Sequence, residues 1–315
     1  ATKLDLNNDK SRAGFSLNVP QDKSVVIAAQ PLLTSSHYAT WLESLKAQHG
    51  VTVSSAGPSV DGRQLWRVTS PAKKHTLLLL GRQHPPETTG ALALISFVER
   101  LFEDDALATR FHDQVGILLY PLINPDGVDK GLWRHNVGGK DLNREWGRFS
   151  QPENRIIDSD VSKWLETHDT ELIKAIDFHS THYEVFYTQP DQSASTMPGL
   201  LGDWLAQFEA LMRSQFDDFD IQRQVSESPQ VNAAKHYFFT KYGISSTTLE
   251  IGDETDRGVI KAYGRAAAES FMSAYFEQPS AGTAIDNRPL DLMFKGGLVV
   301  DGMGAPPYEG DVGVQ

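Results

Sequence analysis

The stretch HTLLLLGRQHPPETTGALALISFVERLFED, residues 75–104, decides the fold of this chain. Residues 75–82 contain a continuous apolar run, which predicts a buried strand. Residues 88–104 repeat apolar side chains at the helical period, which predicts an amphipathic helix. Between them, His84 and Glu87 stand on a turn stiffened by Pro85 and Pro86. We therefore expect an open α/β sheet with polar side chains where its strands end.

The same alternation continues along the chain. Further buried strands are expected at 115–122, 173–180 and 243–252, and further helices at 35–50, 158–168, 198–216 and 256–276. Short strands around the turn Pro20-Gln21-Asp22 are expected at 15–30. Strands that alternate with helices predict an α/β sheet covered on both faces.

Composition limits the classes of function. The chain has 315 residues, 40% of them hydrophobic, which is typical of one large globular domain or slightly more. A net charge of -12 disfavours nucleic acid as a partner, and the absence of cysteine excludes disulfides, thiolate ligands and a cysteine nucleophile. No stretch approaches the roughly 18 apolar residues of a membrane span. A chain that starts at Ala1, with no signal peptide in its sequence, is expected to be a processed form or a fragment.

The polar turn is interpreted as part of a metal site. Catalytic zinc takes about three protein ligands, often two histidines and a glutamate, and leaves a position for water. His84 and Glu87 would supply two ligands, and His179 in the sequence DFHS would supply the third. His182 is a rival third ligand, but at i+3 in a strand it points to the opposite face. Each residue alone also fits an ordinary loop or a structural histidine, so the interpretation depends on their combination.

The segment at residues 120–154 is rich in turn residues and in positive charge. It contains the tight turn NPDG, residues 124–127. Its five basic residues are Lys130, Arg134, Lys140, Arg144 and Arg148. In a chain with a net charge of -12, this cluster indicates an anion site near the metal. The alternative is a solvated loop.

An ordered series of motifs resembles a known family. The motifs are His84-Pro-Pro-Glu87, Asn124-Pro-Asp-Gly127, Arg134, Asp141-Leu-Asn143-Arg144, His179 in DFHS and Glu250 in TTLE. In this order, from about Lys74 to Phe276, they resemble the zinc metallocarboxypeptidases of the carboxypeptidase A family. The proline after the first ligand and the NPDG turn resemble the branch that contains the cytosolic carboxypeptidases. The resemblance implies a mixed central β-sheet with helices on both faces and one zinc ion per chain at the strand ends.

The resemblance also divides the chain into three parts. Residues 1–73 would be a β-rich segment followed by a helix, and residues 74–277 the catalytic domain. Residues 278–315 would be an irregular extension rich in Gly and Pro.

The resemblance implies three metal ligands and one carboxylate that supports them. The resemblance makes His84, Glu87 and His179 the zinc ligands. It makes Asp141 the carboxylate that orients His84 through the other ring nitrogen.

The resemblance also implies which residues act on the substrate. Glu250 would be the general base, and Arg134 would stabilise the oxyanion. Asn143 and Arg144 would bind the free terminal carboxylate of the substrate, since the planar guanidinium binds a carboxylate through two hydrogen bonds.

The sequence departs from the digestive enzymes of the family at two places, and one further position concerns substrate choice. Pro86 stands where the digestive enzymes carry an arginine, and residues 221–230 lack their mobile tyrosine, for which Tyr237 or Tyr242 could substitute. Lys235 falls near the bottom of the pocket for the terminal side chain, with Ala234 as the rival position. A lysine there would favour an acidic side chain, whereas a solvated helix lysine is the alternative reading.

Three alternative functions are considered for these residues. The first is a zinc-dependent metallocarboxypeptidase that hydrolyses the C-terminal peptide bond of a peptide with a free carboxylate, with a preference for acidic ends. The second is a zinc amidase that acts on a small or unusual amide, such as a murein peptide or an N-acyl amino acid. The third is a non-enzymatic binding module, disfavoured because all the side chains required for the chemistry are present.

Overall fold

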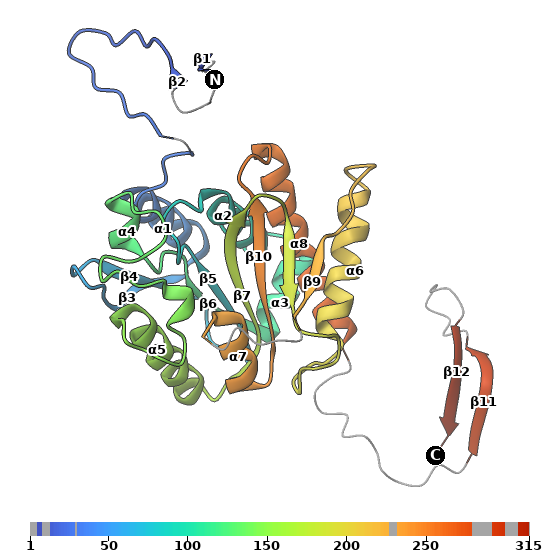
Figure 1. The fold of residues 1–315 in the computed structure, drawn as a ribbon. Coiled ribbons are helices and arrows are strands. Elements are labelled where there is room, and N and C mark those ends of the chain that lie inside the picture. Colours follow the sequence, from blue (N-terminus) through green and yellow to red (C-terminus); the bar gives the residue numbers. More distant parts are fainter. Residues whose placement is uncertain are drawn as a thin grey trace.

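One mixed sheet organises the part of the chain that positions the site. A computed structural model describes residues 5–7, 13–28, 30–226, 232–278, 292–299 and 308–314. Eight strands form the sheet in the order β3-β4-β6-β5-β7-β10-β8-β9 (Figure 1). They are β3 (Thr52–Pro58), β4 (Gln64–Thr69), β5 (His75–Gly81), β6 (Val115–Tyr120), β7 (Glu171–Thr181), β8 (Val185–Thr188), β9 (Arg223–Val225) and β10 (Ser245–Gly252). The strands β6, β5, β7 and β10 run parallel, whereas β3, β4 and β8 pair antiparallel with their neighbours β4, β6 and β10, which confirms a mixed sheet.

Helices cover both faces of this sheet, as expected. They are α1 (Ser35–His49), α2 (Thr88–Leu101), α3 (Ala106–Gln114), α4 (Pro125–Asp129), the 3-10 helix η1 (Leu142–Arg144), α5 (Pro152–His168), α6 (Leu200–Arg213), α7 (Ala234–Tyr242) and α8 (Arg257–Glu277). Side chains of α2, α3, α6 and α8 pack on one face, and those of α5 and α7 pack on the other.

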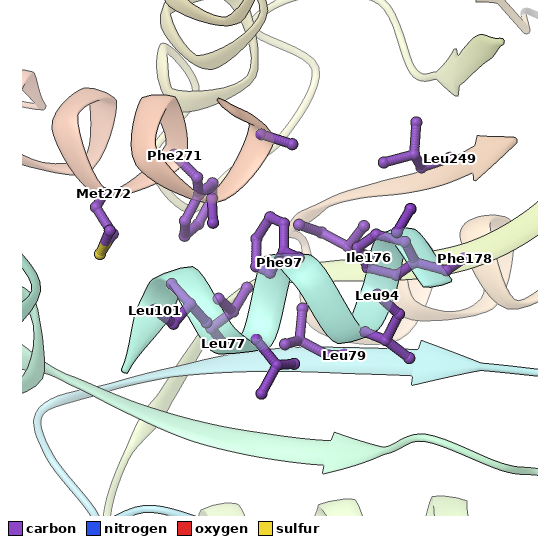
Figure 2. Packing of buried hydrophobic residues seen from close by; sticks show 14 of the residues in the cluster. Leu77, Leu79, Leu94, Phe97, Leu101, Ile176, Phe178, Leu249, Phe271 and Met272 are labelled. Carbon is purple, nitrogen blue, oxygen red and sulfur yellow. The ribbon is translucent and has the colours of Figure 1, made fainter. Parts of the chain in front are cut away.

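The apolar run of β5 explains this two-sided burial. Leu77 and Leu79 belong to the core under α2 and α8, whereas Leu78 and Leu80 belong to the core under α5 and α7. Figure 2 shows α2 lying over β5, with Phe97 among the labelled leucines. Burial of each such side chain stabilises the fold by about 1.5–3 kcal/mol. A continuous apolar run is therefore what a central strand of this sheet requires.

The strands and helices predicted between residues 35 and 276 are all present. The largest difference in bounds is at α5, which begins at Pro152 rather than at residue 158. The expected strands at 15–30 were wrong: the described residues 15–28 contain a turn at Gln21 and Asp22 and no strand. Two short strands, β1 (Asp5–Leu6) and β2 (Ala13–Gly14), pair before that segment.

The ends of the chain add further elements. β3 and β4 pair within the main sheet, so the division expected at residue 73 falls between two strands of one sheet and stays a prediction. Within residues 278–315, expected to be irregular, β11 (Leu292–Val299) pairs antiparallel with β12 (Tyr308–Val314). None of the helices in the described ranges combines the length and apolar character needed to cross a membrane.

Candidate active site

The site lies where three neighbouring parallel strands end (Figure 1). β5 ends just before the turn with His84 and Glu87, and the adjacent β7 carries His179. On the other side of β7, β10 carries Glu250, which is in register with His179. Side chains in register on parallel strands project from the same face of the sheet. Four residues from distant parts of the sequence thus reach one edge of the sheet.

The turn after β5 is held in place by buried polar side chains. Arg82 adopts a left-handed backbone conformation with φ 55°, and its Nε donates to the carbonyl oxygen of Pro85 at 2.9 Å. The predicted NPDG turn is the start of helix α4, and its N-cap residue Asn124 donates from Nδ2 to the carbonyl oxygen of Gln83 at 3.0 Å. These contacts fix the orientation of the backbone on both sides of His84.

The approach of α2 to β7 depends on a glycine. Gly90 lies in the first turn of α2, and a Cβ at this position would overlap the backbone of His179. The amide nitrogen of Gly90 instead donates to Ser180 Oγ at 2.9 Å, and Thr89 Oγ1 also bonds to this hydroxyl at 2.7 Å. The start of α2 is thereby tied to β7 directly beside His179.

The three candidate ligands form one cluster of donor atoms. His84 Nδ1 lies 2.7 Å from Glu87 Oε1, His179 Nδ1 lies 2.8 Å from Glu87 Oε2, and the two Nδ1 atoms are 3.2 Å apart. All the donor atoms of this group lie within 4.8 Å of one another. Two imidazoles and one carboxylate are a donor set typical of catalytic zinc.

Both imidazoles are held from behind by carboxylates. His84 Nε2 lies 2.9 Å from Asp141 Oδ1, and His179 Nε2 lies 2.7 Å from Asp177 Oδ2. A carboxylate accepts the Nε2 proton, so each Nδ1 keeps its lone pair for the centre of the cluster. Two lone pairs that face each other at 3.2 Å repel unless a cation lies between them. The residues present therefore fit a bound metal ion.

Asp177 was missed by the sequence analysis, although a signal was available. Asp177 and His179 stand at i and i+2 on a strand, and such residues point to the same face. Asp177 is 1% exposed, and Gln83 Nε2 donates to its Oδ2 at 2.6 Å. Gln83 in turn accepts a hydrogen bond from Trp146 Nε1 at 2.9 Å. The carboxylate behind His179 is thus fixed by a buried chain of side chains.

The charges of the cluster shift the pKa values of its own residues. Burial acts against the charged form of His84, but the nearby carboxylates of Asp141 and Glu87 outweigh it and raise the pKa of this histidine. For Asp141, burial also opposes the charge, yet the contacts with His84 and Arg134 hold the pKa of this carboxyl below its usual range. The carboxylate behind His84 is therefore ionised at neutral pH.

Glu250 is not one of the three donor residues, and its side chain is not fixed by a hydrogen-bond partner as the two histidines are. Its Oε2 is buried and has no hydrogen-bond partner among the described residues. Burial raises the pKa of Glu250 to about 7, and the nearby His179 opposes this rise. A carboxyl with a pKa near neutrality can both accept and return a proton.

A single pocket of about 450 Å³ brings the predicted residues together. Its lining includes His84, Glu87, Arg134, Asn143, Arg144, His179, Lys235 and Glu250, whereas Asp141 lies behind His84. The other eight residues of the lining were not predicted, and three of them are Tyr187, Gln224 and Thr248. These three stand side by side on β8, β9 and β10, because Tyr187 is in register with Thr248 on one side and with Gln224 on the other.

Two of the residues predicted to bind an anion make polar contacts with other residues of the site. Arg134 Nε donates to Asp141 Oδ2 at 2.8 Å. Asn143 Nδ2 lies 3.3 Å from His179 Nε2, and Asn143 Oδ1 accepts from the amide of Ala234 at 2.8 Å. The η1 segment therefore connects the metal group to the start of α7.

The rival residues take other positions. His182 is exposed and is not part of the donor cluster. The hydroxyl of Tyr237 donates to Asp158, and that of Tyr242 lies 3.2 Å from Ser162 Oγ, so both tyrosines are tied to α5.

Comparisons with known proteins agree with this geometry. The sequence matches cytosolic carboxypeptidase 2 of Xenopus tropicalis with 31% identity over 35% of this chain and 11% of that protein. It matches cytosolic carboxypeptidase 6 of Mus musculus with 29% identity over 39% of this chain and 25% of that protein. The chain thus spans a quarter or less of these two relatives. A metallo-carboxypeptidase from Burkholderia cenocepacia has the same fold, with a TM-score of 0.64, 21% identity and coverage of 78% of this chain and 70% of that one.

The sequence profile described as zinc carboxypeptidase matches residues 38–261, which is well over half of the chain. This match includes β3 to β10, both histidines of the donor cluster, Glu87 and Glu250. The chain therefore belongs to the zinc carboxypeptidase family.

Proposed function

We propose that this chain is a zinc-dependent carboxypeptidase that removes the last residue of a peptide. The observation that carries the proposal is the single pocket, which joins a three-donor metal group to a buried carboxyl and to two arginines. Zinc, when bound, supplies Lewis acidity, which lowers the pKa of water and polarises a carbonyl group. His84, Glu87 and His179 would hold it.

Glu250 is the proton carrier in this proposal. With its pKa raised to about 7 by burial, it takes a proton from the attacking water and gives it to the leaving amine. Its Oε2 has no hydrogen-bond partner within the part of the chain that the structure describes, so this atom is free to accept the proton.

Two arginines bind different negatively charged groups of the substrate in this proposal. Arg134, held by Asp141 at 2.8 Å, directs its remaining N–H groups to the oxygen that becomes negative in the transition state. Arg144 and Asn143 bind the terminal carboxylate, which restricts cleavage to the last peptide bond.

An acidic last residue is the preferred substrate in this proposal. Lys235 lines the pocket, and burial lowers the pKa of its amine to about 8. A partly buried amine gains most from a carboxylate partner, since charges attract more strongly in a drier environment. The polar side chains of Tyr187, Gln224 and Thr248 in the same lining support a polar terminal residue over a large apolar one.

The test combines metal analysis with a substrate series. Zinc is quantified in purified protein, and turnover is measured on acyl dipeptides that differ only in their last residue. Glu250→Gln should retain zinc yet lose turnover by several orders of magnitude, whereas the exposed Glu254→Gln serves as the matched control. An active Glu250→Gln variant would remove Glu250 from its role. Turnover of small amides such as N-acyl amino acids, without turnover of dipeptides, would favour the amidase.

A further inference from the structure

A buried chain of hydrogen bonds leads from a tryptophan to the metal group. Trp146 Nε1 donates to Gln83 Oε1 at 2.9 Å, and Gln83 Nε2 donates to Asp177 Oδ2 at 2.6 Å. The same oxygen of Asp177 lies 2.7 Å from His179 Nε2. All four residues are at most 1% exposed, so water does not compete for these contacts.

The direction of this chain is set at its tryptophan end. An indole N–H group can only donate, so it selects the oxygen of the Gln83 amide. The NH2 group of Gln83 must then face Asp177, and Asp177 Oδ2 has to accept. The other oxygen of Asp177 is buried and has no hydrogen-bond partner in the described ranges. The ring proton of His179 therefore lies on Nε2, and Nδ1 keeps its lone pair.

The tryptophan is itself held in one orientation. Its amide donates to the carbonyl oxygen of Asn232 at 3.2 Å, and Asn232 Nδ2 donates back to the carbonyl oxygen of Trp146 at 3.0 Å. The ring centroid of Trp146 lies 5.1 Å from that of Phe238 in α7. A fully buried ring of this size has no space for a second orientation, since protein cores are densely packed. The indole N–H group is thus a fixed donor.

A neighbouring amide favours the opposite position of the ring proton. Asn143 Oδ1 accepts from the amide of Ala234, so the NH2 group of Asn143 faces His179 Nε2 at 3.3 Å. This donor would be satisfied by a lone pair on Nε2, which places the proton on Nδ1. A ring in that tautomer cannot bind a metal ion through Nδ1. The chain from Trp146 therefore opposes the contact from Asn143.

We propose that Trp146 and Gln83 are positioning residues that keep the ring proton of His179 on Nε2. The inference rests on the metal site of the proposed function. In the wild type, the negative charge of Asp177 acts in the same direction, so the contribution of Trp146 becomes measurable when that charge is absent. In Asp177→Asn, the amide oxygen faces the ring as long as Gln83 presents its NH2 group. If the indole N–H is removed as well, both amides can turn, the chain reverses, and Nδ1 takes the proton.

The test is a double-mutant cycle on zinc affinity, measured by competition between the metal-free protein and a coloured chelator. Trp146→Phe alone should lose at most about threefold in affinity, because the carboxylate of Asp177 still accepts from His179. Combined with Asp177→Asn, it should lose about tenfold more than the product of the two single losses, as residues in one hydrogen-bond network do. Gln83→Met removes the amide and should show the same excess with Asp177→Asn, so the result does not depend on one variant.

A second cycle provides the matched control. Asp141 holds the other histidine, since it lies 2.9 Å from His84 Nε2 and accepts from Arg134. The losses of Trp146→Phe and Asp141→Asn should therefore multiply, with no excess. Thermal unfolding of each metal-free variant separates loss of fold from loss of affinity.

Two outcomes would overturn the inference. One is that the losses of Trp146→Phe and Asp177→Asn multiply, and the other is that an equal excess appears with Asp141→Asn, which would mean that Trp146 only stabilises the site in general. In both cases, zinc binding and dipeptide turnover by wild type would leave the proposed function intact. A wild type that binds zinc but hydrolyses no peptide would instead refute the proposed function, while the two cycles would still decide the role of Trp146.

Discussion

Replacement of Asp177 by Asn tests the metal centre most sharply. The change keeps the volume of the side chain but removes the negative charge 2.7 Å from His179 Nε2. Because Asp177 is 1% exposed, solvent water cannot compensate for the loss of this charge. Gln83 donates to the same oxygen at 2.6 Å, so an amide must present its oxygen to both groups. If it turns its NH2 group to His179 instead, the ring moves its proton to Nδ1 and loses the lone pair that the metal needs.

The expected effect is a loss of zinc affinity of about 10- to 100-fold, typical of removing a carboxylate behind a histidine ligand. This corresponds to ~1.4–2.7 kcal/mol of binding free energy. Asp141→Asn should lose less, because Asp141 is 14% exposed at its side chain and is also held by Arg134.

Metal affinity is measured by competition between the metal-free protein and a coloured chelator. Asp126→Asn is the matched control, since Asp126 is equally buried but bonds to Arg63 at 2.9 Å. Thermal unfolding of the metal-free variants separates loss of fold from loss of affinity. An affinity of Asp177→Asn within twofold of wild type, with a normal melting curve, would refute the role given to Asp177.

Three further predictions concern substrate choice, pH and the metal. Lys235→Glu should shift preference away from C-terminal glutamate and aspartate, and unchanged relative rates across a panel of dipeptide ends would contradict the role of Lys235. Burial holds the pKa of Lys235 at about 8, so its positive charge is lost as the pH rises through that value. The ratio of kcat/KM for glutamate over glutamine ends should therefore fall between about pH 7 and pH 9; a ratio independent of pH would refute this. Removal of the metal with a chelator should abolish turnover and lower the melting temperature, since a ligand bound only by the folded state stabilises it; unchanged values for both would speak against a bound metal, and readdition of zinc is the control.

Much of the fold was predictable because its central strands are buried on both faces. The run Leu77 to Leu80 is apolar at every position, and such runs have few alternatives to a central strand. The peripheral strands gave no comparable signal. β3, with the sequence TVSSAGP, has no apolar alternation, and β9 is only three residues long, so both depend on pairing with neighbours rather than on their own pattern.

Part of the site was also predictable from short-range spacing and motif order. His84 and Glu87 lie on one turn, and the order of the remaining motifs pointed to His179 and Glu250. Asp177 could have been found from its i, i+2 spacing with His179. Tyr187 and Gln224 could not, because they reach the pocket only through the register of β8 with β9 and β10.

The sequence by itself determined which residue types were available: an apolar core for the sheet, and the histidines, carboxylates and arginines of a metal-dependent hydrolase. Only the tertiary structure decided that the Nδ1 atoms of His84 and His179 face each other and that a buried chain of hydrogen bonds joins Trp146 to His179. The physical reason is that contacts between residues far apart in the chain depend on strand order and register, which local spacing does not encode.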